Sequence, residues 1–152
     1  ELGFSLPVRA ETLEEMAASY NSSHPGENVR RAVYASSFTE ASWPSNWRGA
    51  PGSDPAGTIY LVCHSSAIAD LPCNALAKPG VVQVGQTLVI ATNNGDVEVR
   101  MTSVEDAVKL DLTNDPRVQE DRAGKVLLMV CRLSEDGRRT SRTWLYTGEV
   151  QR

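Results

Sequence analysis

The residues of this chain with types suited to covalent chemistry are a thiol at Cys131, a guanidinium at Arg142 and an imidazole at His64. Cys131 ends an apolar run of strand length, and Arg142 opens a second run rich in β-branched and aromatic residues. Asp136-Gly137 between these runs favours a tight hairpin turn. A two-residue turn there would place Cys131 directly opposite Arg142 on one face of a sheet. A cation beside a cysteine lowers the pKa of the thiol and can hold an oxyanion.

The same residues have a simpler interpretation, in which Cys131 is a core cysteine and Arg142 is a solvated surface residue. A looser turn would also shift the register and separate the two side chains. Three other arginines compete for the same role. Arg132 should point away from the face of Cys131, and Arg138 and Arg139 should be solvated at the turn.

Cysteine chemistry needs a base or an imidazolium near the thiol. His64 follows an apolar strand, whereas His24 lies among turn residues, so His64 is the candidate. Cys63 cannot be the partner of His64 in a strand, because neighbouring residues point to opposite faces. We therefore predict a catalytic constellation of His64, Cys131 and Arg142.

Short strands would have to position these residues. Apolar and β-branched runs predict strands at Val29–Ser36, Thr58–Val62, Val81–Ala91, Asp96–Val104, Val126–Cys131 and Arg142–Tyr146. Thr12 with Glu15 three residues later forms a capping box, which predicts a short amphipathic helix that ends near residues 21–23. Asn74–Ala77 predicts a brief helical turn. The pattern indicates a mainly β fold of about seven to eight short strands, either a sandwich or a closed barrel, with an N-terminal helix and short helical turns.

Length and composition fit one globular domain of 152 residues, with 41% hydrophobic and 22% charged residues. We expect a single domain over residues 1–152, in which residues 1–28 form an N-terminal helical extension. The net charge of −4, with acids and bases interspersed, argues against a nucleic-acid partner. No window is long and apolar enough to span a membrane, so we expect any membrane anchor in a segment outside this sequence.

Several motifs together make the chain resemble a sortase, the cysteine transpeptidase of Gram-positive bacterial surfaces. Gly57–His64 (GTIYLVCH) resembles the strand that leads into the family's catalytic histidine, and the spacing from His64 to Cys131 is close to that of the family. Gly85–Ile90 resembles the strand after the histidine loop, and Arg142–Val150 resembles the last strand, which opens with the catalytic arginine. The resemblance covers roughly residues 43–150 and implies a single closed β-barrel of about seven to eight strands.

The chain departs from the family at three positions near these motifs. The run before Cys131 sits where the family has TLxTC, but Leu127 and Val130 replace both threonines. Cys63 stands where the family usually has a small residue. These positions bear on substrate recognition more than on chemistry, because all three reactive residue types are present.

The resemblance implies a reaction and a location. Cys131 would attack a peptide carbonyl in an LPxTG-like sorting signal to give a thioacyl-enzyme. His64 would protonate the leaving amine, and Arg142 would steady the oxyanion or position the peptide. An amine of a peptidoglycan precursor or a pilin lysine would then resolve the thioester. The enzyme would act at the extracellular face of the bacterial membrane. We expect no cofactor and no metal, because no acidic cluster has the spacing of an EF-hand loop.

Other interpretations stay open from the sequence. Another cysteine acyl-transfer enzyme of the cell wall, of the L,D-transpeptidase or amidohydrolase type, would share the reactive thiol but act on peptidoglycan stems. A non-catalytic β-barrel binding module would leave Cys131 inert. Cys63 and Cys73 are either a disulfide that closes the His64 loop or two buried thiols. A zinc site from these cysteines, His64 and Cys131 fits no common ligand pattern.

Overall fold

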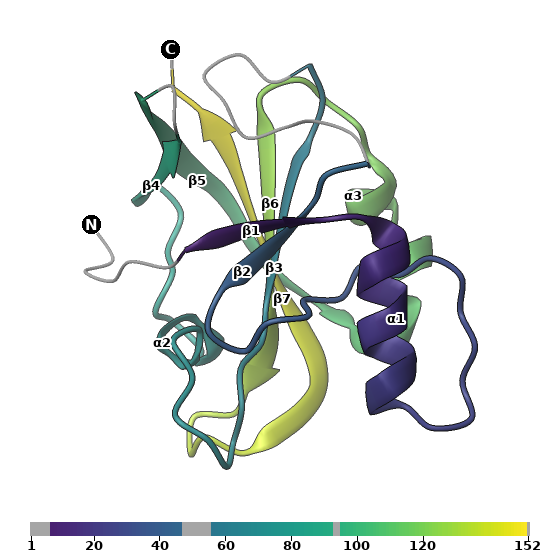
Figure 1. The fold of residues 1–152 in the computed structure, drawn as a ribbon. Coiled ribbons are helices and arrows are strands. Elements are labelled where there is room, and N and C mark those ends of the chain that lie inside the picture. Colours follow the sequence, from purple (N-terminus) through teal and green to yellow (C-terminus); the bar gives the residue numbers. More distant parts are fainter. Residues whose placement is uncertain (1–6, 47–55, 93–94, 152) are drawn as a thin grey trace.

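Seven strands form one curled sheet in the computed structural model, which describes residues 7–46, 56–92 and 95–151 (Figure 1). The strands are β1 (Val8–Glu11), β2 (Ala41–Pro44), β3 (Ile59–Cys63), β4 (Thr87–Thr92), β5 (Gly95–Val108), β6 (Lys125–Leu133) and β7 (Arg139–Val150). The helices are α1 (Leu13–Ser23), α2 (Asn74–Ala77) and α3 (Pro116–Gln119), with the 3-10 helix η1 (Lys109–Asn114). Within the described residues, no helix is long and apolar enough to cross a membrane.

The strand order is β1-β2-β3-β6-β7-β5-β4, so β1 and β4 are the two edges of the sheet. The mainly β fold and the number of strands confirm the prediction, but the barrel is not fully closed. In Figure 1, β1 and β2 cross in front of the longer strands. Their junction with the rest of the sheet is narrow, because Ser42 and Val62 are the one residue pair joining β2 to β3 in the described register.

Strand β6 is the centre of the sheet, parallel to β3 and antiparallel to β7. Its even-numbered residues from Val126 to Val130 belong to a larger core cluster on one face. Leu127 and Met129 belong to a smaller cluster on the other face, together with Tyr60, Ala107, Val118 and Leu145. Burial on both faces explains why β6 reads as a continuous apolar run rather than as an alternating strand.

The hairpin that joins β6 to β7 is looser than predicted. Leu133 pairs with Arg139, so the loop spans residues 134–138, and Gly137 supplies the positive φ of 81°. The register shifts between Cys131 and Leu133, as at a β-bulge. Cys131 therefore pairs with Thr143, and the predicted pairing of Cys131 with Arg142 is wrong.

The capping box predicted at Thr12 is confirmed at the start of α1. The Thr12 hydroxyl accepts from the Glu15 amide, and the Glu15 carboxylate accepts from the Thr12 amide at 2.7 Å. Helix α1 runs to Ser23, which agrees with the end predicted at residues 21–23, and it buries Leu13, Met16 and Ala17. The helical turn predicted over Asn74–Ala77 is also present, as α2.

Other predicted boundaries were wrong. Residues 29–36 form no strand but lie in an irregular connecting segment (residues 24–40) between α1 and β2. The strand predicted from Val81 begins only at Thr87. No strand was predicted at β1 or β2, and no helix was predicted at α3.

Candidate active site

The parallel pairing of β3 with β6 brings His64 to the level of Cys131. Cys63 pairs with Val130, so the next residue on each chain is His64 and Cys131. His64 follows Tyr60 and Val62 on the smaller-cluster face of β3, and Cys131 follows Leu127 and Met129 on the same face of β6. Adjacent strands in register thus present the imidazole and the thiol on one side of the sheet.

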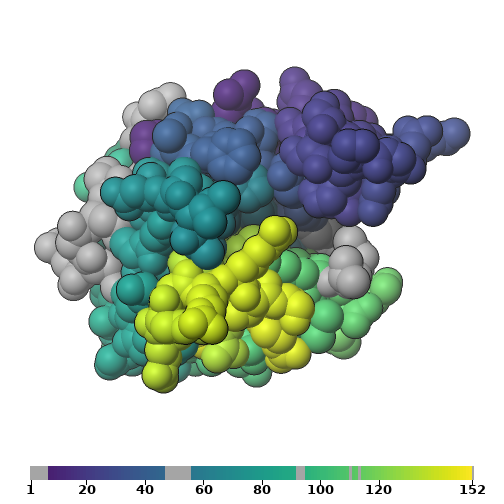
Figure 2. All heavy atoms as spheres, turned by 90° about the horizontal axis from the view of Figure 1, so that it is seen from below, coloured from purple at the N-terminus to yellow at the C-terminus, as the bar shows by residue number. Residues whose placement is uncertain are grey.

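Both residues line a cavity of about 960 Å³ on this side of the sheet. Helix α1, the connecting segment, η1, α3 and the residues after β3 supply the rest of its wall, which is largely apolar. Figure 2 shows the surface hollowed between the N-terminal part of the chain, in purple and blue, and the β6–β7 hairpin, in yellow. A cavity of this size can hold several residues of an extended peptide or a comparable ligand.

The imidazole of His64 is held by the connecting segment. Its Nε2 lies 2.5 Å from the carbonyl oxygen of Ala35. Because a carbonyl can only accept, we assign the proton to Nε2, which leaves the lone pair on Nδ1 when the ring is neutral. The rings of Tyr34 and Phe38 pack against the imidazole, with centroids at 4.8 and 4.9 Å.

Burial lowers the pKa of His64 below its usual value. The hydrogen bond to Ala35 raises the pKa in opposition, and the positive charge of Lys109 lowers it further. The net direction favours a neutral imidazole at pH 7, which can accept a proton.

Cys131 is a free thiol and is half-buried. The Ser65 hydroxyl donates to the Cys131 carbonyl, so the residue after His64 is fastened to the backbone of the cysteine. This contact holds the two chain segments together at the place where the reacting groups lie.

The disulfide left open by the sequence is present between Cys63 and Cys73, whose Cα atoms are 6.3 Å apart. It joins the end of β3 to the start of α2 and so closes the loop that begins with His64. Both cysteines belong to the larger cluster, on the face opposite Cys131.

The structure does not bring Arg142 to the other two predicted residues. Arg142 makes two hydrogen bonds to the Asp106 carboxylate, at 3.0 and 3.1 Å. Its neighbour Thr143 pairs with both Cys131 and Ala107, so Arg142 points to the opposite face of the sheet. The Arg142 guanidinium, followed by that of Arg132, holds the pKa of Asp106 below its usual value.

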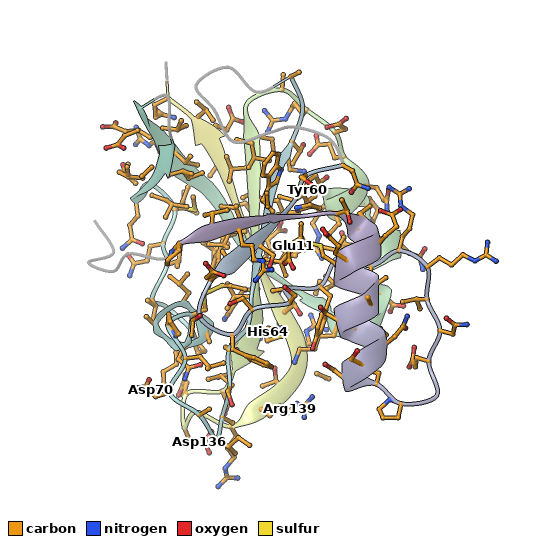
Figure 3. All side chains as sticks on the ribbon, in the orientation of Figure 1. Glu11, Tyr60, His64, Asp70, Asp136 and Arg139 are labelled. Atoms are coloured by element: carbon orange, nitrogen blue, oxygen red, sulfur yellow. A yellow bond between two sulfur atoms is a disulfide. The ribbon has the colours of Figure 1, made fainter. Side chains whose placement is uncertain are left out.

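Sequence reasoning passed over Arg139, which lines the cavity with His64 and Cys131. Arg132 also lines it, but its guanidinium is paired with Asp106. Figure 3 places Arg139 at the end of the sheet where His64 lies. No carboxylate among the described residues pairs with its guanidinium. Arg139, Ser141 and Thr143 alternate along β7, and Thr143 pairs with Cys131. This alternation could have indicated that Arg139 lies on the cavity side of the sheet, but only with the correct register of the hairpin.

No group of three or more His, Cys, Asp or Glu side chains within the described residues could hold a metal ion. The expectation that the protein needs neither metal nor cofactor remains a prediction.

Solved structures of sortases match the chain along most of its length. Listeria monocytogenes sortase A superposes with a TM-score of 0.53 at 13% identity, covering 76% of this chain and 70% of that one. Streptococcus agalactiae sortase C1 superposes with a TM-score of 0.54 at 13% identity, covering 97% of this chain. The chain has a sortase-like fold. It spans 61% of that sortase C1 chain, less than two thirds of its length. No family model and no curated protein matches the sequence.

Proposed function

We propose that the protein is a sortase-type cysteine transpeptidase, which cleaves an LPxTG-like sorting signal and transfers the acyl group to an amine. The observation that carries the proposal is the position of His64 and Cys131, in register on adjacent strands and on the wall of one cavity. The sortase-like fold supports the same reaction class by analogy, because fold alone does not fix function.

The reaction uses the proton on the thiol and the lone pair on Nδ1 of His64. Nδ1 takes the Cys131 proton as the sulfur attacks the scissile carbonyl, and an oxyanion forms. The carbon–nitrogen bond then breaks, His64 returns the proton to the leaving amine, and a thioester remains on Cys131. The incoming amine attacks the thioester, loses a proton to His64, and displaces the sulfur as an amide bond forms.

A guanidinium would stabilise the oxyanion in this scheme. Arg142 is the residue expected from the sequence, and it would have to leave Asp106 and reach the other face of the sheet. Arg139 needs no such rearrangement, because it already lines the cavity. We therefore assign the oxyanion role to Arg139 and keep Arg142 as the alternative.

The partners follow from the reaction. The acyl donor is the sorting-signal peptide of a secreted protein, and the acceptor is a peptidoglycan precursor or a pilin lysine. The Cys63–Cys73 disulfide supports action outside the cytoplasm, at the extracellular face of a bacterial membrane, because disulfides persist in oxidising compartments.

Mass spectrometry tests the proposal directly. The protein is incubated with a pool of LPxTG-like peptides and an amine acceptor, beside Cys131→Ala and His64→Asn. We expect an acyl adduct on Cys131 and a transpeptidation product, both lost in the two variants. An adduct with peptidoglycan stem peptides alone would favour the L,D-transpeptidase alternative. A Cys131 thiol inert to both peptides and iodoacetamide in the folded protein would favour the binding module.

A further inference from the structure

Glu11 is a buried carboxylate that the mechanism above does not use. It lies at the end of β1 with 4% of its surface exposed, next to α1 (Figure 3). A buried carboxylate is costly unless hydrogen bonds compensate for lost hydration. Two serine hydroxyls, from Ser36 and Ser42, donate to Glu11, and the Ser36 amide donates at 3.3 Å.

These bonds join three parts of the chain that meet beside His64. Glu11 belongs to β1, Ser42 belongs to β2 and pairs with Val62 of β3, and Ser36 belongs to the connecting segment. Val62 precedes His64 by two residues on the same face of the sheet. The carboxylate therefore fixes the connecting segment against the strand that carries the histidine.

The residue before Ser36 is Ala35, which is fully buried and whose carbonyl accepts from His64 Nε2. The connecting segment has no helix or strand of its own to fix that carbonyl. Glu11 supplies the anchor one residue away, through both the amide and the hydroxyl of Ser36.

We propose that Glu11 is a positioning residue for His64, acting through Ser36 and the Ala35 carbonyl to hold the imidazole as the Nε2–H tautomer. In this tautomer the Nδ1 lone pair is free for the thiol proton. The chain of contacts plays the part that a carboxylate plays when it orients a catalytic histidine directly, but with a backbone carbonyl in between. The effect of Glu11 on catalysis rests on the proposed function, whereas its effect on the tautomer of His64 does not.

The test measures the imidazole first and activity second. Long-range proton–nitrogen NMR on the folded protein reports which ring nitrogen of His64 carries the proton, with His64→Asn to assign the signal against His24. Glu11→Gln removes one acceptor and introduces a donor facing the serines. We expect it to lower the Nε2–H population and, in the transpeptidation assay, to lower kcat by roughly 10-fold to 100-fold, because small displacements of a catalytic group have large effects on rate.

Glu40→Gln is the matched control, because Glu40 and Glu11 both lie near the Arg9 guanidinium, at 4.0 and 3.8 Å. It removes the same charge without touching the described serine contacts, and we expect a wild-type His64 spectrum. Ser36→Ala removes the hydroxyl from the same link and leaves only the amide contact at 3.3 Å, and it decides the question if Glu11→Gln does not fold. A folded Glu11→Gln or Ser36→Ala protein with a wild-type His64 spectrum would overturn the inference, whatever the activity. An altered His64 spectrum with no transpeptidation by the wild type would keep the inference and reject the proposed function.

Discussion

Arg139 lies on the cavity side of β7, whereas Arg142 lies on the opposite face and binds Asp106. This difference leads to a kinetic prediction. We expect Arg139→Ala to lower kcat/KM for the sorting peptide by on the order of 100-fold, the loss typical of removing one oxyanion donor. Arg142→Ala should lower stability, because it leaves the Asp106 carboxylate with Arg132 as its remaining ion-pair partner among the described residues, and should change kcat/KM less. Steady-state kinetics on purified variants measure both effects.

Arg138→Ala is the control for this pair, because its side chain is 85% exposed at the turn. It should leave kcat/KM unchanged. The reverse ranking, with Arg142→Ala the more damaging variant, would return the oxyanion role to Arg142 and require the Asp106 ion pair to open when peptide binds.

Because of His64, we expect the stability of the folded protein to fall as the pH falls. Its pKa is lowered in the folded protein, mainly by burial, whereas in the unfolded chain it titrates near 6.5. As the pH falls through about 6.5, the unfolded chain binds a proton that the folded protein does not, so stability present above this pH is lost below it. Urea titrations between pH 7.5 and 5.5 measure this loss. His64→Asn should flatten the slope, so an unchanged slope in this variant would refute the assignment.

At the scale of residues, the sequence could predict that the Cys131 thiol and the His64 imidazole lie together, because each ends an apolar strand run, which fixes its place on the sheet. It could not predict which arginine lies beside them, because the face of Arg142 depends on the length of the hairpin loop and on a register shift between Cys131 and Leu133. The sequence could not predict that Glu11 is buried, because its carboxylate is satisfied by Ser36 and Ser42, which are distant in sequence.

His64 is the first residue of the loop that follows β3, and the Cys63–Cys73 disulfide closes this loop. Chain-entropy estimates give a closed loop of this length about 2–3 kcal/mol of stability. We expect the Cys63→Ala/Cys73→Ala double variant to lose roughly that much free energy of unfolding in urea titrations. The Ser65 bond to Cys131 would still hold the start of the loop, so a modest loss of thioester formation is expected.

Reduction of the wild type should reproduce the loss of stability seen in the double variant. If reduced wild type and double variant were both as stable as the oxidised protein, the disulfide would contribute nothing to folding. Cys131→Ala serves as the control, since it removes a thiol that lies outside the disulfide.

Elements with local signals could be predicted, and elements that depend on distant partners could not. Helix α1 begins at a capping box, which is complete within four residues of sequence. Strands β1 and β2 have four residues each, and β2 ends at Pro44. They exist because they pair with each other in parallel, and no local pattern records such a pairing. Residues 29–36 have strand-like composition, but no strand of the sheet pairs with them in the described structure.

At the scale of the molecule, one open sheet supports two clusters, and the site lies on the side of the smaller one. The larger cluster fills the curl of the sheet between β3, β5 and β6, and the smaller one packs under η1 and α3. Strand count and turn spacing fitted a sandwich or a closed barrel, and the family resemblance implied the closed barrel. Closure requires β1 to pair with β4, which depends on how far the sheet curls, a property that short-range patterns do not encode.

The shared strand β6 should make the two clusters unfold together. Leu127 and Leu128 are adjacent, buried and identical in type, but they belong to the smaller and the larger cluster respectively. We expect Leu127→Ala and Leu128→Ala each to cost about 2–5 kcal/mol of stability. Each variant should shift the urea transition by the same amount whether it is followed by far-UV circular dichroism or by tryptophan fluorescence, to which Trp144 beside the larger cluster contributes. If Leu127→Ala moved the circular-dichroism transition and left the fluorescence transition in place, the site side of the sheet would unfold on its own. The cavity that holds His64 and Cys131 would then open without loss of the larger core.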